Sequence, residues 1–469
     1  MAISMCPIVV RLTAAFGLAI GLLAADGTHA ATVQRASVSS TGAEGDGDSY
    51  FPSISANGRY LGFYSYATNL VPGDHNGSSD VFVLDLQTGQ LRRVSLDSAG
   101  TEGNGNSIWS SLSADGHYVA FSSDASNLVH GDTNAQRDIF VHDTQSARTT
   151  RISVNSAGAQ SDGASYRPEA SADGSHVAFH SMATNLVPGD TNAVWDAFVH
   201  DLQTGQTQRI SVDSSGGQTD LDSYGVSVSA DGQVLAFFSR ATALVAGDSN
   251  GRWDIFVHDR TSGLTTRVSV DSAGNQGDGD SQWPSLSADG RFVAFYSLAT
   301  NLVPGDTNAR ADAFVHDRSN GQTTRVSLDS TGTQGDGDTY GVRISADGQR
   351  VAFHSYASNL VSADSNGLED VFVHDRASGR TTRISESDFG VGGDGDSYQP
   401  SLSANGRRVA FASAATQLVP GDSNNVSDVF LWLQDSAVPV PLLGHRAIVL
   451  ICALLALGAW AVERRRRHA

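Results

Sequence analysis

The stretch GDTNARADAFVHD, residues 305–317, holds acidic and amide side chains at a spacing that resembles part of a calcium-binding loop. Asp306, Asn308 and Asp312 offer hard oxygen atoms, and a calcium ion takes about six to eight of them. One such loop supplies too few ligands by itself and has no distal glutamate of the EF-hand type. The other interpretation is structural, because Asp and Asn side chains bind their own backbone in tight turns. The sequence leaves both interpretations open.

The same loop occurs seven times, each with Asp, then Asn two residues later, then Asp four residues after that. A site that exists once would not be copied in this way. The copies are Asp74, Asn76 and Asp80; Asp132, Asn134 and Asp138; Asp190, Asn192 and Asp196; Asp248, Asn250 and Asp254; Asp306, Asn308 and Asp312; Asp364, Asn366 and Asp370; and Asp422, Asn424 and Asp428.

A second family of acidic loops reads GDGDS in its best-kept copies and decays in others. Its acidic pairs are Asp46/Asp48, Asp220/Asp222, Asp278/Asp280, Asp336/Asp338 and Asp394/Asp396. We expect both loop families on the same face of the fold. A neighbouring pair such as Asp336 and Asp338 would then add the oxygens that a calcium cage needs. Calcium is therefore a candidate cofactor, held by such combined loops.

The loops belong to a repeat that must position them. The string SADG or SANG recurs with its glycine at Gly58, Gly116, Gly174, Gly232, Gly290, Gly348 and Gly406, always 58 residues apart. Each unit contains four runs typical of strands, such as YGVRIS, RFVAFYS, DAFVHD and TTRVSL, bounded by Gly, Asn and Asp. The second run is apolar on both faces, which suits a sheet that is covered on both sides.

Seven units of four strands predict an all-β fold, a seven-bladed β-propeller with four antiparallel strands per blade. An open solenoid is the rival, but it needs atypical capping repeats at its ends. The seventh copy ends after its third strand, and residues 32–38 match the fourth strand of the other copies. We therefore expect the N-terminal strand to close the ring, with the propeller spanning residues 31–437.

The repeats resemble the TolB-type, WD-like propeller family. The resemblance rests on S-x-S-A-D-G-x-x-V-A-F followed by D-[VIA]-F-V-H-D and covers nearly all of the body. It implies the propeller fold and says little about function, since this fold hosts many roles. The chain shows no separate N-terminal domain like that of TolB itself.

Histidine recurs in the third strand of five units, at His142, His200, His258, His316 and His374. Each lies on a different blade, so we expect satisfied histidines between blades and no shared metal site. The Asp that follows, as in Asp317, and the Arg of the fourth strand, as in Arg325, are expected to pair across strands. Seven equal copies without an insertion also argue against an active site, so we expect no enzymatic activity.

Aromatic residues follow the GDGDS loops and begin the innermost strand, near the mouth of the channel. They are Tyr50, Trp109, Tyr166, Tyr224, Trp283, Tyr340 and Tyr398. Together with the acids they form a candidate rim for a glycan or a peptide. The alternative is packing between blades.

The two ends of the chain read as targeting segments. Residues 1–30 have Arg11, an apolar run and THA before Ala31, typical of a signal peptide. Residues 447–462 form a short apolar stretch before Arg464, Arg465, Arg466 and Arg467, which should stay in the cytoplasm. We expect a C-terminal transmembrane helix within a tail of residues 438–469.

This tail resembles bacterial tripartite sorting signals of the IPTL and PEP C-terminal class. Val440, Pro441, Leu442 and Leu443 take the place of the Ile-Pro-Thr-Leu motif. The resemblance implies recognition by an exosortase-type membrane protease. A plain C-terminal anchor is the alternative. In both cases we expect the propeller outside the cytoplasm and anchored to the inner membrane. If the tail is a sorting signal, we expect the protein to be sorted onward to the cell surface.

The chain has a net charge of −20, and its basic residues are all arginines. An acidic body does not bind nucleic acid through phosphates. Cys6 and Cys452 lie in the end segments, so the exported body has no disulfide. We expect a non-enzymatic scaffold of the bacterial envelope that binds a protein or a glycan. The alternatives are a propeller enzyme acting on glycans and a calcium-stabilised structural surface protein.

Overall fold

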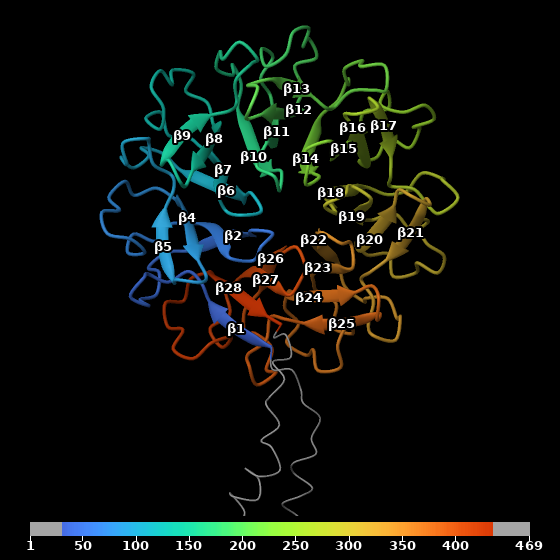
Figure 1. The fold of residues 1–469 in the computed structure, drawn as a ribbon. Coiled ribbons are helices and arrows are strands. Elements are labelled where there is room, and N and C mark those ends of the chain that lie inside the picture. The colour runs from blue at the N-terminus through green and yellow to red at the C-terminus, as the bar shows by residue number, and fades with distance from the viewer. Residues whose placement is uncertain (1–30, 435–469) are drawn as a thin grey trace, which may run out of the picture. The chain divides into compact units, whose positions relative to one another are not determined.

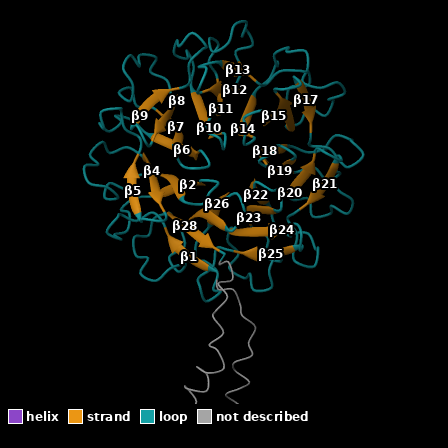
Figure 2. Ribbon diagram, viewed as in Figure 1, coloured by secondary structure: helices purple, strands orange, loops and turns teal. Residues whose placement is uncertain are grey.

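The computed structural model describes residues 31–434. In this part of the chain seven four-stranded antiparallel sheets follow one another around a central axis, as Figure 1 shows. Strands and loops make up the whole of it, without a helix (Figure 2). The predicted seven-bladed β-propeller is confirmed.

The first three strands of each blade lie within one or two residues of the runs predicted from the sequence, and the fourth ends about three residues earlier than predicted. Blade 1 holds β2 (Ser49–Ile54), β3 (Tyr60–Ser65), β4 (Asp80–Asp85) and β5 (Gln90–Arg93). Blade 2 holds β6 (Ser107–Leu112), β7 (Tyr118–Ser123), β8 (Asp138–Asp143) and β9 (Arg148–Arg151). Blade 3 holds β10 (Ser165–Ala170), β11 (His176–Ser181), β12 (Asp196–Asp201) and β13 (Thr207–Arg209). Blade 4 holds β14 (Ser223–Val228), β15 (Val234–Ser239), β16 (Asp254–Asp259) and β17 (Leu264–Arg267).

The remaining three blades follow the same plan. Blade 5 holds β18 (Ser281–Leu286), β19 (Phe292–Ser297), β20 (Asp312–Asp317) and β21 (Gln322–Arg325). Blade 6 holds β22 (Thr339–Ile344), β23 (Arg350–Ser355), β24 (Asp370–Asp375) and β25 (Arg380–Arg383). Blade 7 holds β26 (Ser397–Leu402), β27 (Arg408–Ser413), β28 (Asp428–Leu433) and, from the start of the chain, β1 (Thr32–Arg35).

Each blade is a meander whose first strand lies nearest the axis (Figure 1). Antiparallel neighbours reverse direction, so the loops alternate between two faces. The loops after the second strand and those leading to the next blade share one face, which we call the GDGD face. The loops containing SADG and those between the third and fourth strands form the opposite SADG face.

The first and last strands of the described chain close the ring. In blade 7, β1 pairs antiparallel with β28, and Thr32 lies opposite Leu433 while Arg35 lies opposite Phe430. Closure leaves no blade with a missing outer strand, which removes an edge that could pair with other chains. The predicted closure by the N-terminal strand is confirmed.

The hydrophobic core lies between the blades. One cluster joins Leu61 and Phe63 of blade 1 to Ala410, Val429 and Leu431 of blade 7. Inside each blade a phenylalanine of the second strand stacks on one of the third, as Phe295 does on Phe314 with ring centroids 6.0 Å apart. Both faces of the middle strands are therefore covered, which explains their continuous apolar sequence.

Residues 32–433 form one compact unit. The predicted signal peptide, the apolar stretch 447–462, the motif at Val440 to Leu443 and the cluster Arg464 to Arg467 lie outside the described residues. Among residues 31–434 no helix is long and apolar enough to cross a membrane.

Removal of residues 32–40 should lower the free energy of unfolding by at least about 3 kcal/mol, because Asp422 and Asp428 lose Arg35 and stay buried without a counter-charge. Thermal unfolding followed by circular dichroism measures the change. Gln34→Ala, an exposed position in the same strand, is the control with little expected effect. An unchanged midpoint after the deletion would show that β1 does not hold the ring closed.

Candidate functional site

The seven Asp-x-Asn loops share one structure, in which an arginine of the outermost strand lies between two aspartates. In blade 5, Arg325 Nη1 lies 3.2 Å from Asp306 Oδ1 and 3.2 Å from Asp312 Oδ2. Asn308 Nδ2 donates to Asp312 Oδ2 and to the carbonyl of Gly335, which leads into the next blade. We call this arrangement the arginine clasp.

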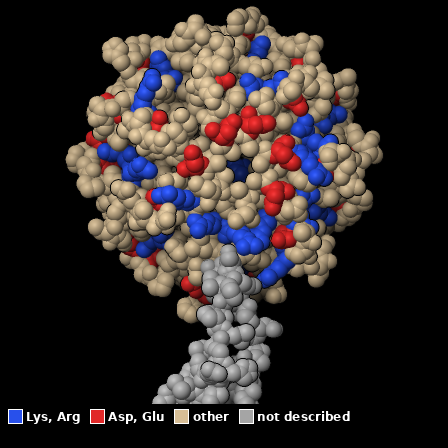
Figure 3. All heavy atoms as spheres, in the orientation of Figure 1, with Lys and Arg blue, Asp and Glu red and all other residues tan. Residues whose placement is uncertain are grey.

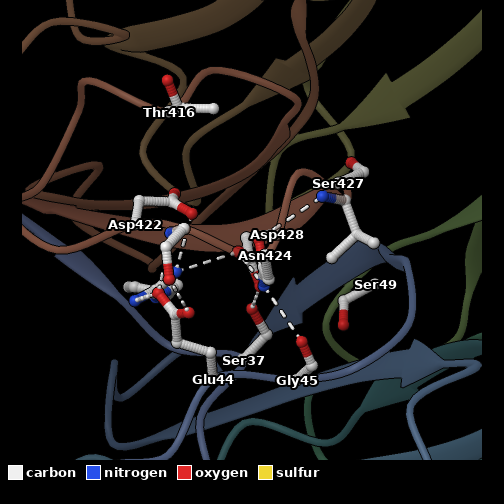
Figure 4. Close-up of polar contacts among 12 residues, drawn as sticks. Ser37, Glu44, Gly45, Ser49, Thr416, Asp422, Asn424, Ser427 and Asp428 are labelled. Atoms are coloured by element: carbon white, nitrogen blue, oxygen red, sulfur yellow. Dashed lines mark hydrogen bonds and ion pairs between the residues drawn. The ribbon is translucent and has the colours of Figure 1, made fainter.

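The clasp recurs in all seven blades. Its arginines are Arg35, Arg93, Arg151, Arg209, Arg267, Arg325 and Arg383. Figure 4 shows the copy that closes the ring, with Asp422, Asn424 and Asp428 of blade 7 against Ser37, Glu44 and Gly45. Here Arg35 also lies 2.6 Å from Glu44.

Asn76 and Asn192 were expected among the calcium ligands, and the structure gives them another role. Asn76 Nδ2 donates to Asp80 Oδ2 at 3.0 Å and to a carbonyl in the loop leading into the next blade at 2.9 Å. Asn192 Nδ2 makes the same two contacts, with Asp196 Oδ2 at 3.0 Å and with the equivalent carbonyl at 2.9 Å. The side-chain N–H groups of Asn76 and Asn192 thus donate to the aspartate and join neighbouring blades.

The aspartates of these two loops are engaged as well. Arg93 Nη1 lies 3.2 Å from Asp74 Oδ1 and 3.0 Å from Asp80 Oδ2. In blade 3 the corresponding distances from Arg209 Nη1 are 3.2 Å to Asp190 Oδ1 and 3.3 Å to Asp196 Oδ2. A guanidinium group therefore stands where the calcium ion was expected.

Arg325 does not pair with Asp317, and that expectation was wrong. The register of β20 and β21 puts Arg325 opposite Phe314 and Gln322 opposite Asp317. Arg325 therefore lies near the start of β20, whereas Asp317 lies at its end. Asp317 instead accepts from Arg291 at 2.6 Å and caps a turn through Ser319. These contacts hold the pKa of Asp317 far below its usual range.

The aspartates of the GDGD loops accept hydrogen bonds both within a blade and between blades. Asp336 accepts hydrogen bonds from the backbone N–H and the hydroxyl of Ser358 at 2.7 and 2.9 Å. Asp338 accepts from the backbone N–H of Ala311 in the preceding blade at 2.9 Å. The structure thus brings both acidic loop families together, but their carboxylates already bind protein donors.

These residues do not fit a calcium ion. The place between Asp306 and Asp312 is taken by a guanidinium group, and Asp336 and Asp338 point to other partners. Among the described residues no group of three or more His, Cys, Asp or Glu side chains could hold a metal ion. Calcium binding stays a prediction that this geometry does not favour.

Arg325→Ala should lower the free energy of unfolding by about 3 kcal/mol, because it leaves Asp306 and Asp312 buried without their counter-charge. Chemical denaturation measures the change. Arg310→Ala is the matched control in the same blade; its half-exposed side chain should contribute less than about 1 kcal/mol.

The same experiment addresses calcium. If the clasps work without metal, the unfolding midpoint of the unaltered protein should not move on adding Ca²⁺ or a chelator. A clear rise with Ca²⁺ would contradict the arginine clasp as the state that stabilises these loops.

The repeated histidines bridge adjacent blades, each in the same way. In blade 3, His200 Nδ1 lies 2.9 Å from Thr207 Oγ1, and Thr207 donates at 2.5 Å to the carbonyl of Val154 in blade 2. Because the threonine donates to the carbonyl, the histidine donates to the threonine. Burial lowers the pKa of His200 to about 4, so the ring is neutral at pH 7.

The repeat itself offers an apolar replacement. Blade 1 has Leu84 opposite Leu91 where five other blades have the His and Thr pair. We expect a His200→Leu/Thr207→Leu double variant to fold, since Leu84 and Leu91 are buried in the same positions.

The pKa of His200 is lower in the folded state than the ordinary 6.5, so the unfolded chain takes up the proton first and stability falls as the pH drops below 6.5. Between pH 6.5 and 4 the double variant should lose about 2 to 3 kcal/mol less than the unaltered protein. Urea denaturation across this pH range measures the difference. Equal losses would show that His200 does not carry the acid sensitivity.

The innermost strands contain an irregularity that points side chains into the channel. In all seven blades the pairing of the first and second strands shifts at the third and fourth residues of the first strand, as between Tyr50 and Ser53. A β-bulge of this kind re-aims a side chain. The first bulged residue has positive φ in every blade: Phe51, Trp109, Arg167, Gly225, Trp283, Gly341 and Gln399.

Five of these seven bulged residues are not glycine, although the conformation costs an L-residue about 1–2 kcal/mol. Strain retained against this cost often marks a functional site. Glycine is needed only where a neighbouring ring lies against the backbone, since a Cβ on Gly225 would be 2.4 Å from Phe238 and one on Gly341 would be 2.3 Å from His354.

Arg167 reaches across the channel from blade 3. Its guanidinium carbon lies 4.0 Å from the ring centre of Trp283, 5.0 Å from that of Trp109 and 5.3 Å from that of Phe51, which belong to three other blades. Within residues 31–434 it forms no ion pair and no hydrogen bond. Burial, and then Arg343, lower the pKa of Arg167 to about 10.

Two residues further along the first strand, five blades place a serine: Ser53, Ser111, Ser227, Ser285 and Ser401. Four of these hydroxyls accept from a backbone N–H of the next blade, as Ser285 does from Ile344 at 3.2 Å. In blade 3 Glu169 replaces the serine and accepts from Ser227 and Val228. In blade 6 Arg343 replaces it and donates to the carbonyl of Val342.

Glu169 and Arg343 are thus the two charges in an otherwise uniform serine ring. They attract each other across more than ion-pair distance, and burial raises the pKa of Glu169 and lowers that of Arg343. With Arg167, the channel holds two guanidinium groups against one carboxylate.

The SADG end of the channel is regular. Seven alanines line it, at Ala56, Ala114, Ala172, Ala230, Ala288, Ala346 and Ala404. Backbone hydrogen bonds link them from blade to blade, such as Ala288 N–H to Ala346 at 3.0 Å and Ala404 N–H to Ala56 at 2.9 Å. The repeat is therefore kept at one end of the channel and broken toward the GDGD end.

The channel encloses a cavity of about 570 Å³. In the face seen in Figure 3, acidic side chains gather around the central opening and a basic side chain is visible inside it. Further basic side chains lie below the opening in this view.

The structure places the predicted aromatic rim at the mouth of the channel on the GDGD face. Trp109, Trp283 and Tyr340 line the cavity. The others pack on their neighbours: Tyr50 on Tyr398, Tyr166 on Trp109 and Trp195, and Tyr224 on Trp195, Phe238 and Trp253.

Four exposed apolar residues surround this mouth at one shared repeat position, directly after the second strand. They are Tyr66, Met182, Leu298 and Tyr356, each between 42% and 50% exposed. A polar group, His354, also faces the cavity, with its Nδ1 2.7 Å from Glu369 Oε1.

Arg167, Glu169 and Arg343 were not predicted from the sequence. A signal was present, because aligning the seven repeats gives serine at five copies of one position and a charge at two. The predictions followed what the repeats share, whereas this group lies where the repeats differ.

Comparison with protein-family models gives no match, and neither does comparison with curated proteins. Among solved structures the chain is similar to an oligogalacturonate lyase in complex with manganese, at 13% identity and a TM-score of 0.53, over 88% of this chain and 95% of that one. It is also similar to the β-propeller domain of the trilobed protease from Pyrococcus furiosus, at 10% identity and a TM-score of 0.50, over 82% and 95%. The putative TolB from Agrobacterium tumefaciens gives 15% identity and a TM-score of 0.40, over 75% and 97%.

At these identities the likeness shows the fold alone. The class of protein that the structure defines is a seven-bladed β-propeller with an asymmetric channel. The same fold occurs in enzymes and in other proteins, so function must be argued from the channel.

Proposed function

We propose that the protein is a non-enzymatic propeller that binds a ligand at the mouth of its channel on the GDGD face. The observation that carries this proposal is the break in the repeat. Seven otherwise matching blades place Arg167, Glu169 and Arg343 in one channel, among the rings of Phe51, Trp109 and Trp283. Buried charges are costly for the fold, so a use for them in binding is the simplest reason to keep them.

The ligand is a protein or a glycan of the bacterial envelope. This part of the proposal rests on the N-terminal segment and the basic, apolar C-terminal tail, which predict export and anchoring. The exposed apolar residues around the mouth support it, because they offer a contact surface larger than the channel itself.

A propeller enzyme acting on glycans is the second candidate. It is supported by His354, Glu369 and Tyr340 beside Arg343, which provide groups able to move a proton. An assay of glycan cleavage separates the two candidates, since a binding protein leaves the glycan intact. The third candidate, a calcium-stabilised structural surface protein, would leave the channel residues without a role.

A Glu169→Ser/Arg343→Ser double variant restores the uniform serine ring and tests the proposal. Its free energy of unfolding should equal or exceed that of the unaltered protein, because a buried charge pair is replaced by the serines that the other five blades already hold. Binding to a panel of envelope glycans and peptides, measured by surface plasmon resonance, should weaken at least about tenfold.

The position of the binding face has its own control pair. Leu298→Asp, at the mouth, should weaken binding, whereas Leu264→Asp, equally exposed on the SADG side, should not. Unchanged binding in both the double variant and Leu298→Asp would refute a site at this mouth.

A further inference from the structure

The charge balance of the channel indicates which chemical group it receives. The carboxylate of Glu169 attracts Arg343, and Arg167 is the second guanidinium group of the channel. The remaining wall is made of apolar and aromatic side chains with serines, Gln399 and His354. One positive charge is therefore left over, inside a molecule whose net charge is −20. An anionic group on the ligand would balance it.

Arg167 presents the donors for such a group. A guanidinium group has five N–H donors in its plane, and aromatic rings stacked on its face leave these donors unused. The rings of Trp283, Trp109 and Phe51 hold the group in place, while no acceptor within the described residues receives its N–H bonds. Two parallel N–H donors match the two oxygens of a carboxylate.

We propose that the channel binds the C-terminal end of a polypeptide, with its α-carboxylate on Arg167. This inference rests on the proposed function and deepens it by naming the ligand class. A chain end is needed because the site lies inside a channel that opens at the mouth, where an internal segment would have to enter as a loop.

Two observations favour a peptide over a sugar chain that ends in a carboxylate, and a third favours either chain over a free small anion. One face of Trp109 and one face of Trp283 already contact Arg167 and cannot stack on a sugar ring. The mouth is surrounded by Met182, Leu298 and two tyrosines, which suit apolar side chains. The acidic exterior repels a free small anion, so an anion that binds must gain affinity from the chain that carries it.

The first experiment selects ligands for the full-length protein from a library of random tetrapeptides displayed with free C-termini. Selected peptides are then synthesised as the free acid and as the C-terminal amide. The amide should bind at least about tenfold more weakly, because it loses the charge-assisted bonds to Arg167.

Arg167→Gln then tests the residue. The variant should fold, because Gln399 occupies the same repeat position with nearly the same φ, 56° against 50°. Acid and amide should bind it equally. Arg240→Gln is the matched control, since Arg240 also stacks on a tryptophan on the GDGD face, 4.6 Å from the ring centre of Trp253, but lies at the exposed surface. It should keep the preference for the acid.

Each other outcome has a separate meaning. Peptides that bind the unaltered protein equally as acid and amide would overturn the carboxylate assignment and leave the proposed function standing. If the library yields no binding peptide but a uronate-ended oligosaccharide binds in a manner that depends on Arg167, the ligand is a glycan and the peptide proposal is wrong. No binding of any peptide, oligosaccharide or envelope ligand to the unaltered protein would overturn both proposals.

Discussion

The arginine clasp is the contact on which the rest of the fold depends. One guanidinium group from the outermost strand of a blade pairs with two aspartates of the loop after the second strand, and the asparagine between them reaches the next blade. Without the arginine, each blade would bury two like charges at its most crowded corner. With it, the acidic loops become rigid joints, and seven joints of one kind fix the blades at equal spacing.

Because the clasps use the features that all seven repeats share, the channel is free to vary. The hydrogen-bonded alanine ring holds the SADG end. Toward the GDGD end the bulge turns one residue of every blade inward, and only there do bulky and charged residues replace small ones. Stability and binding thus occupy different positions of the same 58-residue unit, which lets one change without the other.

The histidines illustrate the same division. His200 and its equivalents suggest chemistry in the sequence, yet each is buried, neutral and bonded to the adjacent blade. The leucine pair at Leu84 and Leu91 shows that an apolar contact fills the same space. Arg167, in contrast, has no counterpart among the other copies and no protein acceptor within the described chain.

The sequence by itself determined the number of blades, the four strands of each and the closure by residues 32–35, since an unbroken repeat of apolar and turn residues permits few other arrangements. Of the seven aromatic residues that it suggested for the rim, Trp109, Trp283 and Tyr340 line the channel. It did not decide what the acidic loops bind. The arginine of the clasp lies on the fourth strand, and the pairing of β20 with β21, which the sequence spacing does not reveal, brings Arg325 to Asp306. Nor did it reveal the group around Arg167: residues from four blades meet there only because the ring closes and the bulges turn them toward one axis.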